Sequence, residues 1–114
     1  MKVVHVMPTE PVSEQTSVNR LTEALGMEKQ HANVWTLAEG RSMLKHVHHH
    51  QEEFYLVLDG RAQMEIDGTL YQLGERDAIC VPPGAVRQMT NIGEDPMTFA
   101  CVASPPVEGD AEKS

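Results

Sequence analysis

From residue 31 onward the chain is a succession of short runs rich in β-branched, aromatic or alternating apolar residues, separated by turn signals. The runs are HANVWTLA, SMLKHVH, EFYLVLD, RAQMEI, TLYQL, AICV, AVRQMTN and MTFACVA. Short strands separated by Gly, Pro and Asp-Gly turns are typical of sandwiches and barrels built from hairpins. The loop Asp67-Gly68 between RAQMEI and TLYQL predicts the clearest hairpin. The pattern predicts an all-β fold.

A length of 114 residues fits one domain with its own core. We expect an N-terminal arm over residues 1–30 that packs on the barrel, the barrel itself over residues 31–106, and a flexible tail over residues 107–114. The arm is polar and turn-rich, although the segment SVNRLTEALG has an apolar spacing that predicts a short helix ending at Gly26. The tail has the composition of a poorly ordered terminus.

Charge and hydropathy exclude several classes of function. The formal net charge of −8 argues against a protein that binds the phosphate backbone of nucleic acids. No apolar stretch is long enough to span a bilayer, so we expect a soluble, cytoplasmic protein with neither nucleic acid nor membrane as a partner. Cys80 and Cys101 each lie in an apolar run and lack the spacing of a zinc or redox pair, which predicts two buried, reduced thiols.

The segment KHVHHHQEEF concentrates histidines where a strand is expected to turn and return. Side chains at i and i+2 of a strand share a face, so His46 and His48 would converge on one point. A carboxylate at the start of the return strand would complete a His, His, Glu set, with Glu53 a better candidate than Glu52. This set suits Mn, Fe, Co, Ni or Zn rather than Mg or Ca. His50 is a reserve ligand, and a merely solvated histidine-rich turn is the competing interpretation.

The spacing of residues around these histidines resembles the first motif of the cupin superfamily. Gly40, five residues, His46, one residue, His48, four residues, Glu53, six residues and Gly60 follow that motif. The resemblance extends from about residue 38 to residue 106 and is closest to small single-domain bacterial cupins. It implies a double-stranded β-helix barrel, related to jelly rolls.

The second cupin motif is matched only in part. The family pattern is Gly-Asp, then Pro-x-Gly, two residues, His, three residues and Asn. The corresponding residues of this sequence are Asp77, Pro82-Pro83-Gly84, Arg87 and Asn91. Arg76 stands where the family usually has the Gly. Arg87 stands where the resemblance implies the fourth metal ligand, a histidine. A guanidinium stays protonated and has no free lone pair, so it cannot ligate a cation.

Three consequences of Arg87 remain open at the level of sequence. In the first, His46, His48 and Glu53 still hold a metal, and Arg87 contacts an anionic group of the substrate. In the second, Arg87 takes the place of the metal by pairing with Glu53, which gives a metal-free barrel. In the third, Arg87 swings out to the rim, and His50 or a water supplies the missing ligand.

Strand parity also predicts which side chains line the pocket. Tyr55 is a candidate catalytic residue, because a phenol beside a metal can act as an acid, a base or a hydrogen-bond donor to a substrate. The full set expected to face the pocket is Ser42, Leu44, Tyr55, Val57, Ala85 and Met89.

The resemblance implies a small cupin that binds a divalent transition metal (Fe, Mn, Ni, Zn or Cu) and acts on or binds a small organic molecule, anionic where Arg87 contacts it. Cupins of this size include dioxygenases, isomerases, decarboxylases, lyases and ligand sensors. The alternatives are a metal-free cupin serving as a small-molecule binding or sensing module, and a structural barrel that acts through its dimer surface. We expect a homodimer, because a barrel of short strands must protect its edges.

Overall fold

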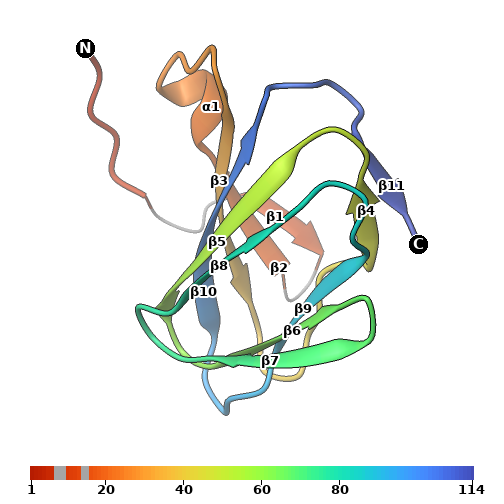
Figure 1. Cartoon of the computed structure of the whole chain (residues 1–114). Helices are drawn as coiled ribbons and strands as arrows, with labels where there is room; N and C mark the ends of the chain where they lie inside the picture. Colours follow the sequence, from red (N-terminus) through yellow and green to blue (C-terminus); the bar gives the residue numbers. More distant parts are fainter. Residues whose placement is uncertain (7–9, 14–15) are drawn as a thin grey trace.

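The computed structural model describes residues 1–6, 10–13 and 16–114, and almost all of its regular structure is strand (Figure 1). The elements are β1 Glu10–Ser13, β2 Thr16–Arg20, α1 Leu21–Ala24, β3 His31–Leu37, β4 His46–His48, β5 Glu52–Asp59, β6 Ala62–Ile66, β7 Thr69–Leu73, β8 Ala78–Val81, β9 Arg87–Asn91, β10 Met97–Ser104 and β11 Ala111–Lys113. No helix of the described residues is long and apolar enough to cross a membrane.

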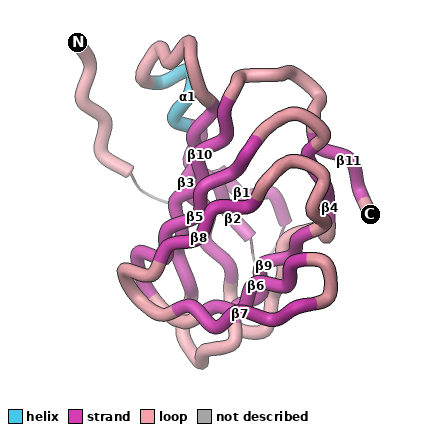
Figure 2. Tube along the Cα trace, in the orientation of Figure 1, coloured by secondary structure: helices cyan, strands magenta, loops and turns pink. Residues whose placement is uncertain are grey.

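The strands form two antiparallel sheets that enclose the core. One sheet has the order β1-β2-β3-β10-β5-β8 and the other the order β11-β4-β9-β6-β7. Figure 2 shows how loops connect strands of one sheet to strands of the other around a common interior. The inward-facing residues of both sheets form one buried cluster, which includes Tyr55, Val57, Met64, Met89 and Phe99. The prediction of an all-β, double-stranded β-helix fold is confirmed.

The predicted Asp-Gly hairpin is present. Strands β6 and β7 pair from Ala62 and Leu73 up to Ile66 and Thr69, and only Asp67 and Gly68 lie between them. Both loop residues have positive φ, 47° and 85°. This is the combination that a type I′ turn requires, and its twist matches that of the flanking strands.

The N-terminal region adds strands to the barrel. Strand β2 pairs with β3 along its whole length, and Val18 at its centre is fully buried. The predicted helix is shortened to the single turn α1, because pairing with β3 buries Val18 in the sheet rather than on a helix face. Gly26 follows that turn with φ of 66°, as expected of a helix stop. Residues 7–9 and 14–15 of the predicted arm lie outside the described residues.

The tail expected to be flexible contains a strand. Strand β11 pairs antiparallel with β4, so that Ala111 lies opposite His48 and Lys113 opposite His46. Asp110 is buried, and the backbone amide of Ser114 donates to the carbonyl oxygen of Lys45. The polar composition suggested disorder, but the open edge of β4 offers backbone partners that composition does not reveal.

Two residues at motif positions, Arg76 and Gly60, have a backbone conformation with positive φ. Arg76, which replaces the usual family Gly, has φ of 70°, the left-handed conformation that glycine adopts without strain. Asp77 secures this turn by accepting a hydrogen bond from the amide of Gly74 at 2.8 Å. Gly60, the last residue of the first motif, has φ of 91°, and a Cβ there would lie 3.1 Å from Met97 Cα. The motif glycine is therefore required both by conformation and by space.

We predict that Gly60→Ala lowers the free energy of unfolding by about 2–3 kcal/mol, because left-handed strain and a backbone clash add together. Gly68→Ala is the matched control, since Gly68 has φ of 85° but open space around it. Strain alone should cost the control about 1 kcal/mol. Urea denaturation measures both values, and equal losses in the two variants would contradict the proposed clash with Met97.

Candidate metal centre

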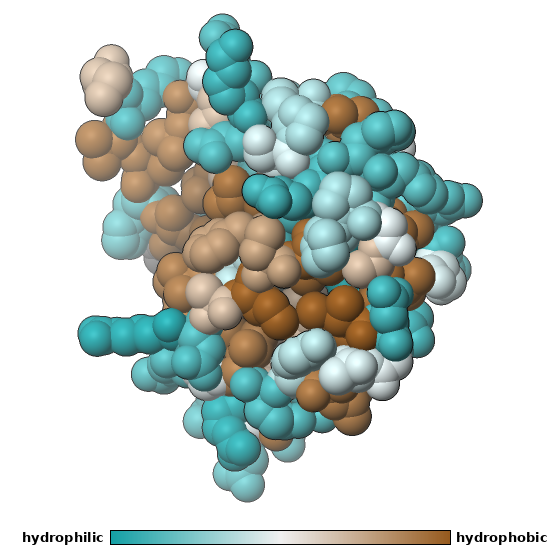
Figure 3. Space-filling model, viewed as in Figure 1, coloured by the Kyte–Doolittle hydropathy of each residue, from teal (hydrophilic) through white to brown (hydrophobic). Residues whose placement is uncertain are grey.

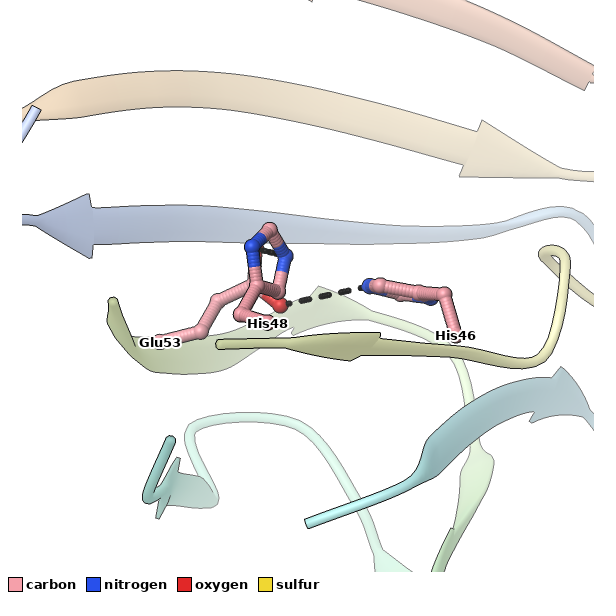
Figure 4. A group of neighbouring side chains, drawn as sticks. All are labelled: His46, His48 and Glu53. Carbon is pink, nitrogen blue, oxygen red and sulfur yellow. Dashed lines mark ion pairs between the residues drawn. The ribbon is translucent and has the colours of Figure 1, made fainter. Parts of the chain in front are cut away.

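Three side chains with metal-binding atoms come together at one end of the barrel. His46 and His48 lie on the same face of β4, and Glu53 faces them from the start of β5 (Figure 4). His46 Nε2 lies 3.6 Å from Glu53 Oε1, and His48 Nε2 lies 3.3 Å from Glu53 Oε2. One potential ligand atom from each residue fits within 4.8 Å of the other two. Strand alternation and a tight return therefore place these residues as the sequence pattern predicted.

The outer nitrogens of the two imidazoles are directed away from this point. His46 Nδ1 lies 2.8 Å from the carbonyl oxygen of Leu44, which can only accept a hydrogen bond. Nδ1 therefore donates to this carbonyl, and the bond holds the ring with Nε2 on the side of Glu53. His48 Nδ1 is buried without a hydrogen-bond partner and lies 3.5 Å from Asp110 Oδ2. Carboxylates and carbonyls placed in this way orient metal-binding histidines.

Glu53 is a buried carboxylate held by several donors. Tyr55 and Arg87 donate to Oε1, the latter at 3.1 Å, and the Cys101 thiol donates to Oε2 at 3.0 Å. Burial alone would raise the pKa of Glu53, but hydrogen bonds from His46, His48, Cys101 and Tyr55 hold that pKa well below its usual range. A carboxylate oxygen has two lone pairs, so Oε2 keeps one beside His48 after Cys101 has used the other.

Arg87 is completely buried beneath this carboxylate. Its Nη1 donates to Glu53, its Nε donates to the carbonyl oxygen of Ala85 at 3.0 Å, and its Nη2 donates to that of Pro82 at 3.0 Å. The rim position considered from the sequence is not the one observed. The observed geometry is the pairing with Glu53, and Arg87 does not line the pocket that His46 and His48 line. A contact between Arg87 and a substrate stays a prediction that this burial does not favour.

Tyr55 and His50 each bind a carboxylate, Tyr55 that of Glu53 and His50 that of Asp110. Tyr55 is fully buried, and burial together with the charge of Glu53 raises its pKa well above the usual range, so its hydroxyl remains a donor to Glu53. His50 Nδ1 lies 2.8 Å from Asp110 Oδ1, and 71% of its side chain is exposed. Among the described residues, the grouped ligands are His46, His48 and Glu53, without the reserve ligand His50.

A pocket of about 480 Å³ opens above the candidate ligands. Its lining consists of Thr16, Asn33, Trp35, Ser42, Met43, Leu44, His46, His48, Glu53, Cys101 and Ala111. Ser42 and Leu44 line it as predicted. The other four side chains expected to face the pocket, Tyr55, Val57, Ala85 and Met89, instead belong to the core cluster.

Sequence reasoning missed two residues that shape this centre. Cys101 was assigned only to packing, and its buried thiol in fact donates to Glu53. Its inward position on β10 was the available signal. Asp110 accepts hydrogen bonds from the backbone amides of His50 and Gln51 at 2.9 to 3.1 Å, and no local pattern pointed to it. Cys80, predicted to be buried, is exposed, because β8 is an edge strand and Cys80 faces outward.

The donor set fits a divalent transition metal on chemical grounds. Two imidazole nitrogens and one carboxylate oxygen form the ligand type used for Fe, Mn, Co, Ni and Zn, with positions left open for water or a ligand. The hydrogen bond of His46 to Leu44 fixes the ring without using Nε2, and the bond from Cys101 leaves one lone pair on Oε2 of Glu53.

The family model described as Cupin domain matches residues 33–103. The chain is a cupin. A solved structure named as a sugar phosphate isomerase of the cupin superfamily, SPO2919 from Silicibacter pomeroyi, is 27% identical, with a TM-score of 0.75 over 82% of this chain and 61% of that one. Among curated relatives, the uncharacterized protein MJ1618 of Methanocaldococcus jannaschii is 34% identical over 59% of this chain and 54% of its own length.

A second curated relative is much longer. Mannose-1-phosphate guanylyltransferase of Escherichia coli is 35% identical over 60% of this cupin, but the match covers only 14% of the enzyme. The cupin thus spans about half or less of the length of these curated relatives. The comparisons establish the family and the fold, and they include a protein named as a sugar phosphate isomerase among the structural neighbours.

We predict that Arg87→Met lowers the free energy of unfolding of the metal-free protein by about 3 kcal/mol, because it leaves Glu53 buried without its cation. The double variant Arg87→Met with Glu53→Gln should lose at least about 1 kcal/mol less stability than the sum of the losses of the two single variants. Urea denaturation of the two single variants and the double variant measures this coupling. Lys45→Met, which breaks the half-exposed pair between Lys45 and Glu65, should cost less than about 1 kcal/mol. Additive losses at Glu53 and Arg87 would contradict the coupling.

We also predict that the metal-free protein loses stability as the pH falls from about 6 to about 3. The pKa of Glu53 is below its ordinary value of 4.5 and that of Asp110 is below 3.8, because in each case hydrogen bonds outweigh the effect of burial. Such groups stabilise the fold above their unfolded-state pKa, and this contribution disappears as they are protonated at lower pH. Thermal unfolding followed by circular dichroism measures the slope. Glu53→Gln should flatten it, and an unchanged slope would contradict the assignment.

Proposed function

We propose that this cupin binds one divalent transition metal ion through His46, His48 and Glu53 and presents it to a small organic molecule in the pocket above. The supporting observation is that one ligand atom from each residue lies within 4.8 Å of the other two, on the wall of a pocket of about 480 Å³. Pockets of this size accommodate small ligands.

Arg87 changes the proposed centre without blocking it. Its guanidinium binds Oε1 of Glu53, whereas Oε2 lies beside His48 Nε2. The positive charge of Arg87 compensates the negative charge of Glu53, so a bound metal would keep more of its own charge than it would with a free carboxylate. We expect weaker metal affinity than a fourth histidine would give, and stronger polarisation of any oxygen atom that the metal holds.

A metal bound here would supply Lewis-acid chemistry or an anchor for a ligand oxygen. The residues of the chain would hold the ion and orient its ligands. His46 and His48 hold the ion on one side, so that its open positions face the pocket. Tyr55 and Cys101 fix the carboxylate of Glu53 with two donated hydrogen bonds. The structural neighbour named as a sugar phosphate isomerase supports metal-assisted isomerisation as one possible reaction, alongside the others that the family implies.

The second candidate is a metal-free cupin that binds or senses a small molecule. The Arg87–Glu53 ion pair favours it, because a buried carboxylate already has its countercharge without a metal. In that case the pocket would use its imidazoles as ordinary hydrogen-bond groups.

We predict about one equivalent of Fe, Mn, Ni, Cu or Zn in protein expressed without a histidine tag and never exposed to nickel resin. Inductively coupled plasma mass spectrometry measures the content. His46→Ala should lose the metal, because it removes one of three ligands. His49→Ala is the matched control, since His49 is half exposed and its Nε2 contacts Glu112 at the surface.

Arg87→His tests the same centre by adding a ligand instead of removing one. A histidine at this position restores the fourth family ligand and should tighten zinc binding measured by competition with a chelator. A folded wild-type protein that contains no metal and gains no thermal stability from added metals would favour the metal-free candidate.

We propose that the cupin forms a homodimer through the outer face of β5 and β8. Figure 3 shows apolar side chains gathered on this face, and Phe54, Leu58 and Cys80 on these strands are exposed. Strand β8 also lies at one edge of its sheet. We predict a sedimentation mass of twice the 12.7 kDa of the chain, reduced by Phe54→Lys. A wild-type monomer at micromolar concentration would contradict the dimer.

A further inference from the structure

The walls of the pocket differ chemically from its metal-facing side. Trp35 contributes an aromatic ring from β3, Met43 and Leu44 contribute apolar side chains from the segment before β4, and Ala111 closes the side formed by β11. Thr16, Asn33 and Ser42 are the neutral polar groups in the lining. Apolar walls with a few polar groups favour ligands that have an apolar body and a localised polar head.

Within the described chain, no lysine or arginine lines this pocket. Arg87 is buried and its three guanidinium nitrogens donate to Glu53, Ala85 and Pro82. Lys45 is outside the lining and pairs with Glu65 at 2.8 Å. A phosphate group carries about two negative charges and is usually bound by arginine, lysine or several backbone amides. The described lining of the pocket therefore lacks the lysine and arginine side chains that usually bind the phosphate of a phosphorylated sugar.

The charge at the proposed metal favours a monoanionic head group. Two neutral imidazoles add no charge, Arg87 balances Glu53, and the buried Asp110 carboxylate lies 3.5 Å from His48 Nδ1, so a divalent ion would leave the centre with a net charge of about one. Burying that charge against Trp35, Met43 and Leu44 is costly unless an anion compensates it. A carboxylate on the ligand would do so with one oxygen atom and leave the rest of the ligand against the apolar walls.

We propose that the ligand of this pocket is a small monocarboxylate with a ring-sized apolar body, whose carboxylate oxygen binds the metal and whose body packs against Trp35, Met43 and Leu44. This inference rests on the metal site proposed above. It excludes phosphorylated sugars as the preferred ligands, in contrast to what the names of two of the compared proteins suggest.

Trp35 is the only tryptophan and lines the pocket, so its fluorescence reports occupancy directly. The zinc-loaded protein is titrated with benzoate, cyclohexanecarboxylate, acetate and mannose 1-phosphate, and its zinc content is measured in parallel. We expect both ring acids to bind at least about tenfold more tightly than acetate, because each buries a six-membered ring that acetate lacks. We also expect benzoate to bind more tightly than mannose 1-phosphate, and to lose most of its affinity when zinc is removed.

Leu44→Ser tests the apolar wall. Leu44 is 68% exposed, so the substitution is compatible with folding, and it should weaken benzoate severalfold more than acetate. Leu70→Ser is the matched control, since Leu70 is 54% exposed on β7 and outside the pocket, and it should leave benzoate binding unchanged. Calorimetry on Trp35→Phe checks that the fluorescence change reports binding.

Two failures can be distinguished. A zinc-loaded protein that binds mannose 1-phosphate more tightly than benzoate, or benzoate no better than acetate, would overturn the assigned ligand class and leave the metal site standing. A protein that takes up no zinc would overturn the metal site and this inference together. Equal benzoate affinity with and without zinc would overturn the contact between carboxylate and metal.

Discussion

The ion pair between Arg87 and Glu53 is the constraint around which this end of the barrel is organised. Neither charge can be buried alone at acceptable cost, so each fixes the other. Arg87 also donates hydrogen bonds to the carbonyl oxygens of Ala85 and Pro82. Together with its bond to Glu53, these link the loop before β9 to the start of β5. With one oxygen of Glu53 held in this way, the other is directed to the imidazole side of the centre.

The two sheets supply the rigidity that this ion pair needs. Glu53 lies on β5 of one sheet, whereas Arg87 and the two histidines lie on β9 and β4 of the other. The pair therefore crosses the barrel interior rather than linking neighbours on one strand, and His46 lies opposite Arg87 in the register of β4 and β9. Strand β11 then covers the outer edge of β4, and Asp110 holds the turn that follows His48. Order at the candidate ligands thus depends on the C-terminal residues as well as on the barrel.

Membership of the cupin family explains the barrel fold and the position of the candidate ligands, but not which ligand the pocket prefers. The first motif is complete, and the family ligands that it contributes lie together. The second motif carries an arginine in place of a ligand, which alters the charge of the centre rather than its shape. The pocket walls come from β2, β3 and the segment before β4. None of these residues is a fixed position of the two motifs, so ligand preference can differ from that of relatives with the same fold.

Local sequence patterns were enough to predict the all-β fold, the Asp67-Gly68 hairpin and the convergence of His46, His48 and Glu53. Each of these depends on local rules, namely the alternation of side chains along a strand and the chemistry of two-residue turns. The direction of Arg87, the pairing of residues 111–113 with β4 and the mainly apolar lining of the pocket depend on contacts between distant segments. Arg87 and Glu53 are 34 residues apart, and Asp110 is about 60 residues from the backbone that it binds. The partner of a buried charge depends on which distant strands become neighbours, and no local pattern encodes that choice.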